Sequence, residues 1–160
     1  MTVSAPRLAL AADLAAIEEL TRAAYSPYTA LLGAPPLPVT EDYRPRIDRE
    51  EIWLLDDGPE GAAGGLSGLI VLETHPDHVM VFSVAVAPSS QGLGLGVRLL
   101  GFAEEQAAKA GLSEVRLYTN ARMERNIALY RSLGFVETGR RPNPVRPGWT
   151  VVDMIKRLRV

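Results

Sequence analysis

The chain has 160 residues, of which 47% are apolar and 22% charged, and its net charge is −2. This length and balance predict one globular domain over residues 1–160, and the lack of a basic run argues against nucleic-acid binding. The sequence has no cysteine and two histidines, which excludes disulfides and thiolate chemistry and argues against a metal centre. No segment reaches about 18 consecutive apolar residues, so we expect no membrane span, no signal peptide and a cytoplasmic protein.

The N-terminal part of the chain combines apolar periodicity with many prolines. Residues 3–10 predict a short strand, and residues 11–25 predict a helix that ends at the Ser-Pro step after it. Residues 25–47 contain five prolines, so we expect a short helix near residues 28–32 and otherwise an ordered loop.

Three apolar runs follow, at residues 51–56, 68–74 and 79–86, each of a length typical of a strand. The glycine- and alanine-rich residues 61–65 predict a hairpin loop, and a Pro-Asp pair between the last two runs predicts a tight turn. Short connections of this kind join antiparallel strands, so the three runs predict a meander.

Residues 83–101 are the stretch around which the chain is organised. An apolar, β-branched run stops at a proline, crosses three glycines at every second position, Gly92, Gly94 and Gly96, and continues as a helix predicted over residues 94–110. Glycines let the backbone approach a ligand closely, and the first amides of a helix have no partner within it. Because the positive end of the helix dipole lies behind them, such amides bind phosphate.

Three kinds of phosphate-binding loop compete for this stretch. No lysine followed by serine or threonine comes after Gly96, which argues against a Walker A loop. Val97 occupies the position of the third glycine of a dinucleotide-binding loop, which argues against that motif. The remaining pattern, Gln91-x-x-Gly94-x-Gly96, resembles the acetyl-CoA pyrophosphate loop of the Gcn5-related N-acetyltransferase (GNAT) family, Gln/Arg-x-x-Gly-x-Gly/Ala.

A second motif lies on a helix predicted over residues 123–133. Asn126 and Tyr130 are four positions apart and share one helical face, and Gly134 is expected to end the helix in a left-handed conformation before Phe135 opens a strand. The run Asn-x-Ala-x-Tyr-x-x-x-Gly-Phe resembles the second GNAT signature, with fewer residues between the asparagine and the alanine. The alternative for such a helix is that the tyrosine fills the core and the asparagine is solvated.

The resemblance implies an α+β fold with a GNAT-like seven-stranded sheet, mixed and mostly antiparallel, with flanking helices and a splay between strands four and five. A helix connects strand four to the strand predicted at residues 113–120, so this pair should be parallel, with a right-handed crossover. Residues 135–137 open a sixth strand, residues 139–149 form a proline-rich connection, and residues 150–158 form the last strand.

The resemblance also implies an enzyme that takes acetyl-CoA as its acyl donor and acetylates a primary amine of a small metabolite or peptide. The alternative is a non-catalytic acyl-CoA-binding sensor that keeps the loop but does not react. The partners expected are acetyl-CoA and the amine acceptor, and a homodimer is an assembly that the sequence allows.

The same resemblance assigns roles to individual residues. Tyr130 would be the general acid that protonates the departing CoA thiolate, and a fourth-strand N–H would stabilise the oxyanion. Tyr25, Tyr28 and Ser83 are expected to contact the acceptor, although these tyrosines and Tyr43 would also suit the edge of a small core. The residues expected to bind the cofactor, through backbone or side chain, are Val84, Val86, Gln91, Gly92, Leu93, Gly94, Leu95, Gly96, Val97, Asn120, Asn126 and Tyr130.

The motifs do not supply the general base. An amine with a pKa of about 10.4 must lose a proton before or during attack, and Met80 aligns with a glutamate of several family members. The candidates for the base are Glu73, His75, His78, Ser83 or an ordered chain of waters.

The proline-rich connection carries three arginines, Arg140, Arg141 and Arg146. They suit an acceptor with a carboxylate or phosphate, or are simply solvated.

Overall fold

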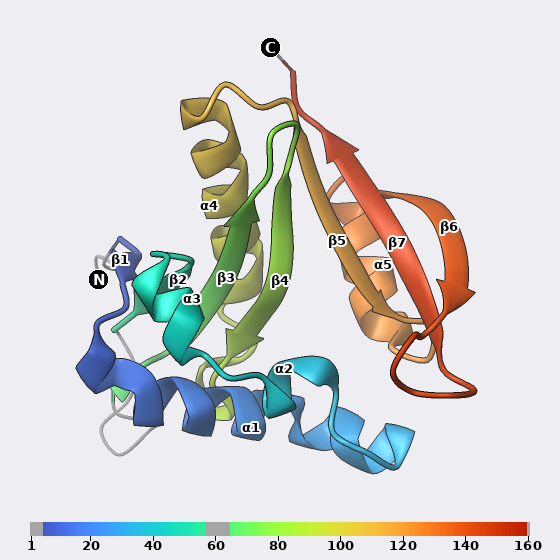
Figure 1. Cartoon of the computed structure of the whole chain (residues 1–160), viewed down its shortest axis with the longest axis horizontal. Coiled ribbons are helices and arrows are strands. Elements are labelled where there is room, and N and C mark those ends of the chain that lie inside the picture. The colour runs from blue at the N-terminus through green and yellow to red at the C-terminus, as the bar shows by residue number, and fades with distance from the viewer. Residues whose placement is uncertain (1–4, 57–64, 160) are drawn as a thin grey trace. The chain divides into compact units, whose positions relative to one another are not determined.

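The computed structural model describes residues 5–56 and 65–159 of the chain. The strands form one sheet in the order β1-β2-β3-β4-β5-β7-β6 (Figure 1). The pairs β1–β2, β2–β3, β5–β7 and β6–β7 are antiparallel and β4–β5 is parallel, which confirms the predicted α+β fold. The helices and strands are β1 (Arg7–Leu8), α1 (Leu14–Leu32), α2 (Leu37–Thr40), α3 (Arg44–Asp48), β2 (Ile52–Leu55), β3 (Gly68–Thr74), β4 (Val79–Val86), α4 (Leu95–Lys109), β5 (Glu114–Asn120), α5 (Glu124–Ser132), β6 (Val136–Pro142) and β7 (Thr150–Arg157).

Contacts within the chain divide it into two compact units. The first comprises Met1–Leu72 and Phe82–Phe102, and the second comprises Glu73–Val81 and Ala103–Val160. Strand β4 and helix α4 each contribute residues to both units. The single domain over residues 1–160 therefore stays a prediction.

The first unit has its core between α1 and the strands β2 and β3. Ile52 is paired with Val71 and Leu54 with Leu69, so these side chains leave the same face of the ladder. All four are buried, as is Ile17 of α1. The cluster they form also contains Ala9, Leu20, Tyr43, Leu66, Phe82, Ala85 and Ala87.

Helix α1 is longer than predicted, because it continues through Pro27 as far as Leu32. Pro27 is exposed, so water can reach the carbonyl that loses its N–H partner there. The extension buries Leu32, and the helix ends at Gly33, whose φ of +79° suits a left-handed cap. The predicted break after residue 25 was thus wrong, and the helix expected near residues 28–32 is the last part of α1.

Two other expectations for this part of the chain are corrected or fall outside the described residues. The segment predicted as a loop contains the short helices α2 and α3, each with a proline in its first turn, where no N–H donor is needed. Residues 3 and 4 of the predicted first strand, and residues 61–64 of the predicted hairpin loop, lie outside the described residues.

The second unit is an antiparallel ladder of β5, β7 and β6, to which the start of β4 adds in parallel. The parallel pairing joins residues 79–81 with residues 115–117, the limited pairing that the predicted splay requires. Strand β6 extends to Pro142, so residues 139–142 belong to a strand rather than to the predicted loop. Figure 1 shows α5 behind β5 and β7, on one face of this ladder.

Candidate functional site

The glycine loop of the first unit has the backbone geometry that a phosphate site needs. Gly92 and Gly94 have φ values of +83° and +78°, in the left-handed region that glycine enters without a steric penalty. The first hydrogen bond of α4 runs from the amide of Arg98 to the carbonyl of Gly94, at 3.0 Å. The amides of residues 95–97 therefore precede the first bonded turn, at the positive end of the helix dipole.

Space around the loop is open. A Cβ atom at Gly92, Gly94 or Gly96 would meet nothing within 4 Å, and Leu93 at the tip is 73% exposed. The requirement for glycine at the first two positions is therefore one of backbone conformation, because no neighbouring atom excludes a larger residue. Gln91, also exposed, directs its amide to the Val86 carbonyl at 3.5 Å.

Tyr25 of α1 and Ser83 of β4, both predicted to contact a substrate, meet in the first unit. The Tyr25 Oη lies 3.1 Å from the Ser83 Oγ and donates to the Val84 carbonyl at 3.4 Å. One phenolic proton cannot serve both oxygens, so when Tyr25 donates to Val84, Ser83 donates to Tyr25. Ser83 is 3% exposed and Tyr25 is half-buried, which makes this an ordered polar contact inside the unit.

The three N-terminal tyrosines, considered either as acceptor contacts or as part of the core, differ in their burial. Tyr43 is 1% exposed, donates to the Pro38 carbonyl and belongs to the core, and burial raises the pKa of its phenol. Tyr28 is half-buried, with its ring 6.4 Å from that of Tyr25. The core interpretation therefore holds for Tyr43, while Tyr25 and Tyr28 form a separate pair on α1.

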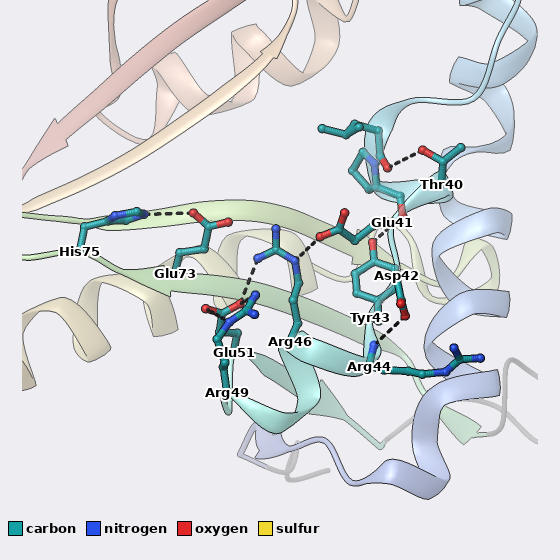
Figure 2. A network of polar contacts seen from close by, with 12 residues as sticks. Thr40, Glu41, Asp42, Tyr43, Arg44, Arg46, Arg49, Glu51, Glu73 and His75 are labelled. Atoms are coloured by element: carbon teal, nitrogen blue, oxygen red, sulfur yellow. Dashed lines mark hydrogen bonds and ion pairs between the residues drawn. The ribbon is translucent and has the colours of Figure 1, made fainter. Parts of the chain in front are cut away.

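Arg46 holds the α2–α3 segment in place. Its side chain, 8% exposed, donates to Glu41 at 2.6 Å and to Glu51 at 3.1 Å (Figure 2). The guanidinium also lies 3.8 Å from the centroid of the Phe82 ring, immediately before Ser83 in β4. A buried cation with two carboxylates and an aromatic face is strongly constrained, so this contact orders a segment that the prolines alone would leave irregular.

In the second unit, α5 carries the predicted catalytic tyrosine. Tyr130 is 7% exposed, and its ring meets that of Phe135 edge-on at 6.0 Å. Gly134 has a φ of +99°, so the predicted left-handed end of this helix is confirmed. Asn126 is half-buried one turn before Tyr130, and Asn120 accepts the amide of Arg122 at 2.8 Å in the turn that leads to α5.

The candidates for the general base in the second unit are engaged with one another. Glu73 lies 3.0 Å from the Nε2 of His75 (Figure 2), and the Nδ1 of His78 lies 2.6 Å from Asp77. The two imidazole rings stack in parallel at 4.6 Å. The hydrogen bond with His78 and the charge of Arg116 lower the pKa of Asp77, which favours its carboxylate form. Ser83 belongs to the other unit, with Tyr25.

The described residues contain neither a metal-binding cluster nor a membrane-spanning helix. Among them, no group of three or more histidines, cysteines, aspartates or glutamates could hold a metal ion. No helix in residues 5–56 or 65–159 is both long and apolar enough to cross a membrane.

A family model described as acetyltransferase (GNAT) family matches residues 15–135, which include the glycine loop, Tyr25, Ser83 and Tyr130. The chain belongs to the GNAT family. The resemblance proposed from the two motifs, both of which lie within the matched residues, is confirmed.

Curated relatives of this GNAT chain match over part of their length. Mycothiol acetyltransferase of Paenarthrobacter aurescens (strain TC1) is 44% identical over 62 residues, which cover 39% of this chain and 19% of that protein. The IAA acetyltransferase of Azospirillum brasilense is 38% identical over 72 residues, 45% of this chain and 47% of that protein. The matches thus span about a fifth and about half of these relatives.

Solved structures share the fold over the whole chain. N-acetylglutamate synthase from Neisseria gonorrhoeae, complexed with coenzyme A and N-acetyl-glutamate, superimposes with a TM-score of 0.68 and 21% identity. The superposition covers 100% of this chain and 36% of that one. At this identity the likeness shows the fold alone.

Several residues with ordered side-chain contacts carry no motif. Arg46, Phe82, Tyr118 and Asp153 were not singled out in the sequence, and each acts through a partner distant along the chain. A signal for Asp153 did exist, because a lone acidic residue inside the apolar β7 run needs a cationic neighbour.

Proposed function

We propose that this GNAT chain transfers the acetyl group of acetyl-CoA to a primary amine. The observation that carries the proposal is the loop before α4, where left-handed Gly92 and Gly94 lead to a helix start whose amides at residues 95–97 precede the first helical hydrogen bond. A diphosphate placed there would receive several N–H bonds and the favourable field of the dipole. Membership of an acetyltransferase family makes the diphosphate of CoA its natural occupant.

The remaining donor contacts come from residues on both sides of the loop. In the proposal, residues 91–97 bind the diphosphate, and the backbone of Val84 and Val86 pairs with the pantetheine arm as with another strand. The Val84 carbonyl already accepts a hydrogen bond from the Tyr25 hydroxyl. Because a carbonyl oxygen has two lone pairs, it can also accept one from the pantetheine arm. Asn120 and Asn126 supply side-chain amides to the cofactor.

Tyr130 acts as the general acid. The neutral amine attacks the thioester carbonyl, the C–S bond of the tetrahedral intermediate breaks, and the thiolate takes the phenolic proton of Tyr130. The nitrogen then loses one proton, which restores the Tyr130 phenol through water. The edge-on contact with Phe135 and the burial of the ring support this role, because they restrict the directions in which the hydroxyl can point.

Tyr25, Ser83 and Tyr28 contact the acceptor, a small metabolite or a peptide amine. When Ser83 donates to Tyr25 and Tyr25 donates to Val84, the Ser83 Oγ keeps lone pairs that can accept a hydrogen bond. An amine N–H is a suitable donor to that oxygen. The polar contact would thus orient the nitrogen before it attacks.

The test is thiol release from acetyl-CoA by the purified chain with a panel of amines, together with its melting temperature with and without acetyl-CoA. We expect acetyl-CoA to raise the melting temperature and at least one class of amine to release CoA. A stabilised protein that releases no thiol with any amine would indicate a non-catalytic acyl-CoA sensor instead. No stabilisation and no thiol release would refute the assignment of the glycine loop.

A further inference from the structure

A polar cluster on the second unit has no part in the proposed donor site. Tyr118 of β5, Asp153 of β7 and Arg141 of β6 lie on one face of the ladder, because Tyr118 pairs with Asp153 and Arg141 pairs with Val151, two residues before Asp153. Arg141 reaches diagonally to Asp153 and places its guanidinium carbon 5.8 Å from the centroid of the Tyr118 ring.

The guanidinium of Arg141 is held along one edge only. Its Nε donates to one oxygen of Asp153 at 2.8 Å and its Nη2 to the other at 3.2 Å. Within residues 5–56 and 65–159 no hydrogen bond or ion pair engages Nη1, and the side chain is 47% exposed. The fork therefore still offers its outer edge, Nη1 with the second N–H of Nη2, to a planar or tetrahedral oxyanion.

Arg141 stays cationic, and a second arginine lies on the same hairpin. Asp153 raises the pKa of Arg141, so the cation is kept over the whole working range. Arg146, on the connection between β6 and β7, lies with its guanidinium carbon 5.2 Å from the Trp149 ring centroid and adds a second positive charge to this hairpin. A rigid arginine loses less conformational entropy on binding than a mobile one, which improves its use as a recognition group.

The register also relates Arg141 to the proposed cofactor ligands. Asn120 and Arg141 both pair with Val151, one from each side, so the three residues form one row across the ladder. Two strand spacings separate Asn120 and Arg141, about 10 Å between backbones. This separation suits a small acceptor whose amine lies near the cofactor and whose anionic group lies near Arg141.

We propose that Arg141, oriented by Asp153 and Tyr118, binds an oxyanionic group of the acceptor, a carboxylate or a phosphate. The acceptor is then an amino acid or similar small amine that carries its negative charge a few bonds from the nitrogen. This specificity rests on the proposed acetyl transfer, which it narrows to anionic amines.

The experiment compares matched acceptors. Thiol release is measured with a panel of free amino acids, with the amide of each, and with aminomethylphosphonate as a phosphate-like partner of glycine. We expect kcat/KM for an anionic acceptor to exceed that for its amide by about tenfold or more, the size of a charge-assisted contact. The ranking of carboxylate and phosphonate then identifies which oxyanion the site takes.

Variants attribute the preference to Arg141. Arg141→Gln should bring the ratio of anion to amide close to one through KM, with little change in kcat for the amide, and Arg141→Lys should keep only part of the preference. Arg140→Gln is the matched control, because Arg140 is the neighbouring arginine and its Nε is 3.1 Å from Glu137. Melting temperatures verify that each variant is folded.

The outcomes are distinguishable. Equal turnover of amides and acids by the unmodified chain, or a preference that survives in Arg141→Gln, would overturn the role of Arg141 and leave acetyl transfer standing. An equal loss in Arg140→Gln would show a general charge effect and would also overturn it. No thiol release with any amine would refute the proposed acetyl transfer, and this specificity with it.

Discussion

The glycine loop between β4 and α4 and the Tyr130 face of α5 offer different chemical groups. The loop offers backbone amides, and its geometry depends on φ angles near +80° at Gly92 and Gly94. The α5 face offers side chains, and its geometry depends on packing, since Tyr130 is 7% exposed against Phe135. A backbone site is lost when a Cβ is added, whereas a side-chain site is lost when a functional group is removed.

This difference matters for how each region tolerates change. Leu93 in the loop and Val97 in the first turn of α4 are 73% and 45% exposed, so their side chains contribute little to the fold, and other residues can replace them without loss of the amides. In the proposed mechanism the Tyr130 hydroxyl itself supplies the proton, so replacing this side chain removes the acid. The predictions below test the contrast, beginning with the largest expected effect.

The side-chain site is tested most directly by Tyr130→Phe. The ring and its contact with Phe135 remain, so the melting temperature should change little, while kcat should fall about 100-fold as the thiolate loses its acid. The KM for acetyl-CoA should stay within a factor of about two. Steady-state thiol release measures both constants, and an unchanged kcat would remove Tyr130 from the chemistry.

The backbone site is tested by Gly94→Ala. A Cβ at a φ of +78° costs roughly 1–2 kcal/mol, so the loop should leave this conformation and the affinity for acetyl-CoA should fall about tenfold. Calorimetric titration with acetyl-CoA measures this. Gly101→Ala in the middle of α4 is the matched control: no atom lies within 4 Å of its Cβ, and the change should stabilise the helix by up to about 1 kcal/mol. Equal affinities of the two variants would contradict a backbone-built site.

Gly134→Ala separates conformational strain from ligand binding. Its φ is +99° and an added Cβ would lie 3.2 Å from the Cε of Lys156, so we expect a loss of roughly 1–2 kcal/mol in the free energy of unfolding. Because Gly134 only ends α5, the folded variant should bind acetyl-CoA normally. Urea unfolding measures the free energy of unfolding, and calorimetric titration measures the affinity for acetyl-CoA. A stability equal to that of the parent chain, or weaker acetyl-CoA binding by the folded variant, would break the contrast with Gly94.

The Tyr25–Ser83 contact combines both kinds of group, since the Tyr25 hydroxyl also meets a backbone carbonyl. A double-mutant cycle with Tyr25→Phe, Ser83→Ala and the double variant should give a coupling of about 1 kcal/mol in the free energy of unfolding. Both single variants should raise the KM of the acceptor a few-fold and leave the KM of acetyl-CoA unchanged. Additive effects within a few tenths of a kcal/mol would mean that the two hydroxyls do not interact in solution.

Local signals predicted β3 and β4 to the residue and α4, β5, α5 and β7 to within two residues at each end. The misses have physical causes. Pro27 was taken as a helix end because proline removes a donor, yet the burial of Leu32 and the cap at Gly33 outweigh that one bond. Residues 33–50 have no period of their own, and their order depends on Arg46, which contacts Glu41, Glu51 and Phe82.

By itself the sequence determined the order of the elements and the glycine loop, because periodicity and a left-handed φ are properties of a few consecutive residues. Only the tertiary structure decided which side chains meet. Tyr25 and Ser83 are 58 positions apart, and Arg141, Asp153 and Tyr118 come from three strands. Such contacts depend on strand register and on packing against distant segments, which no local pattern encodes.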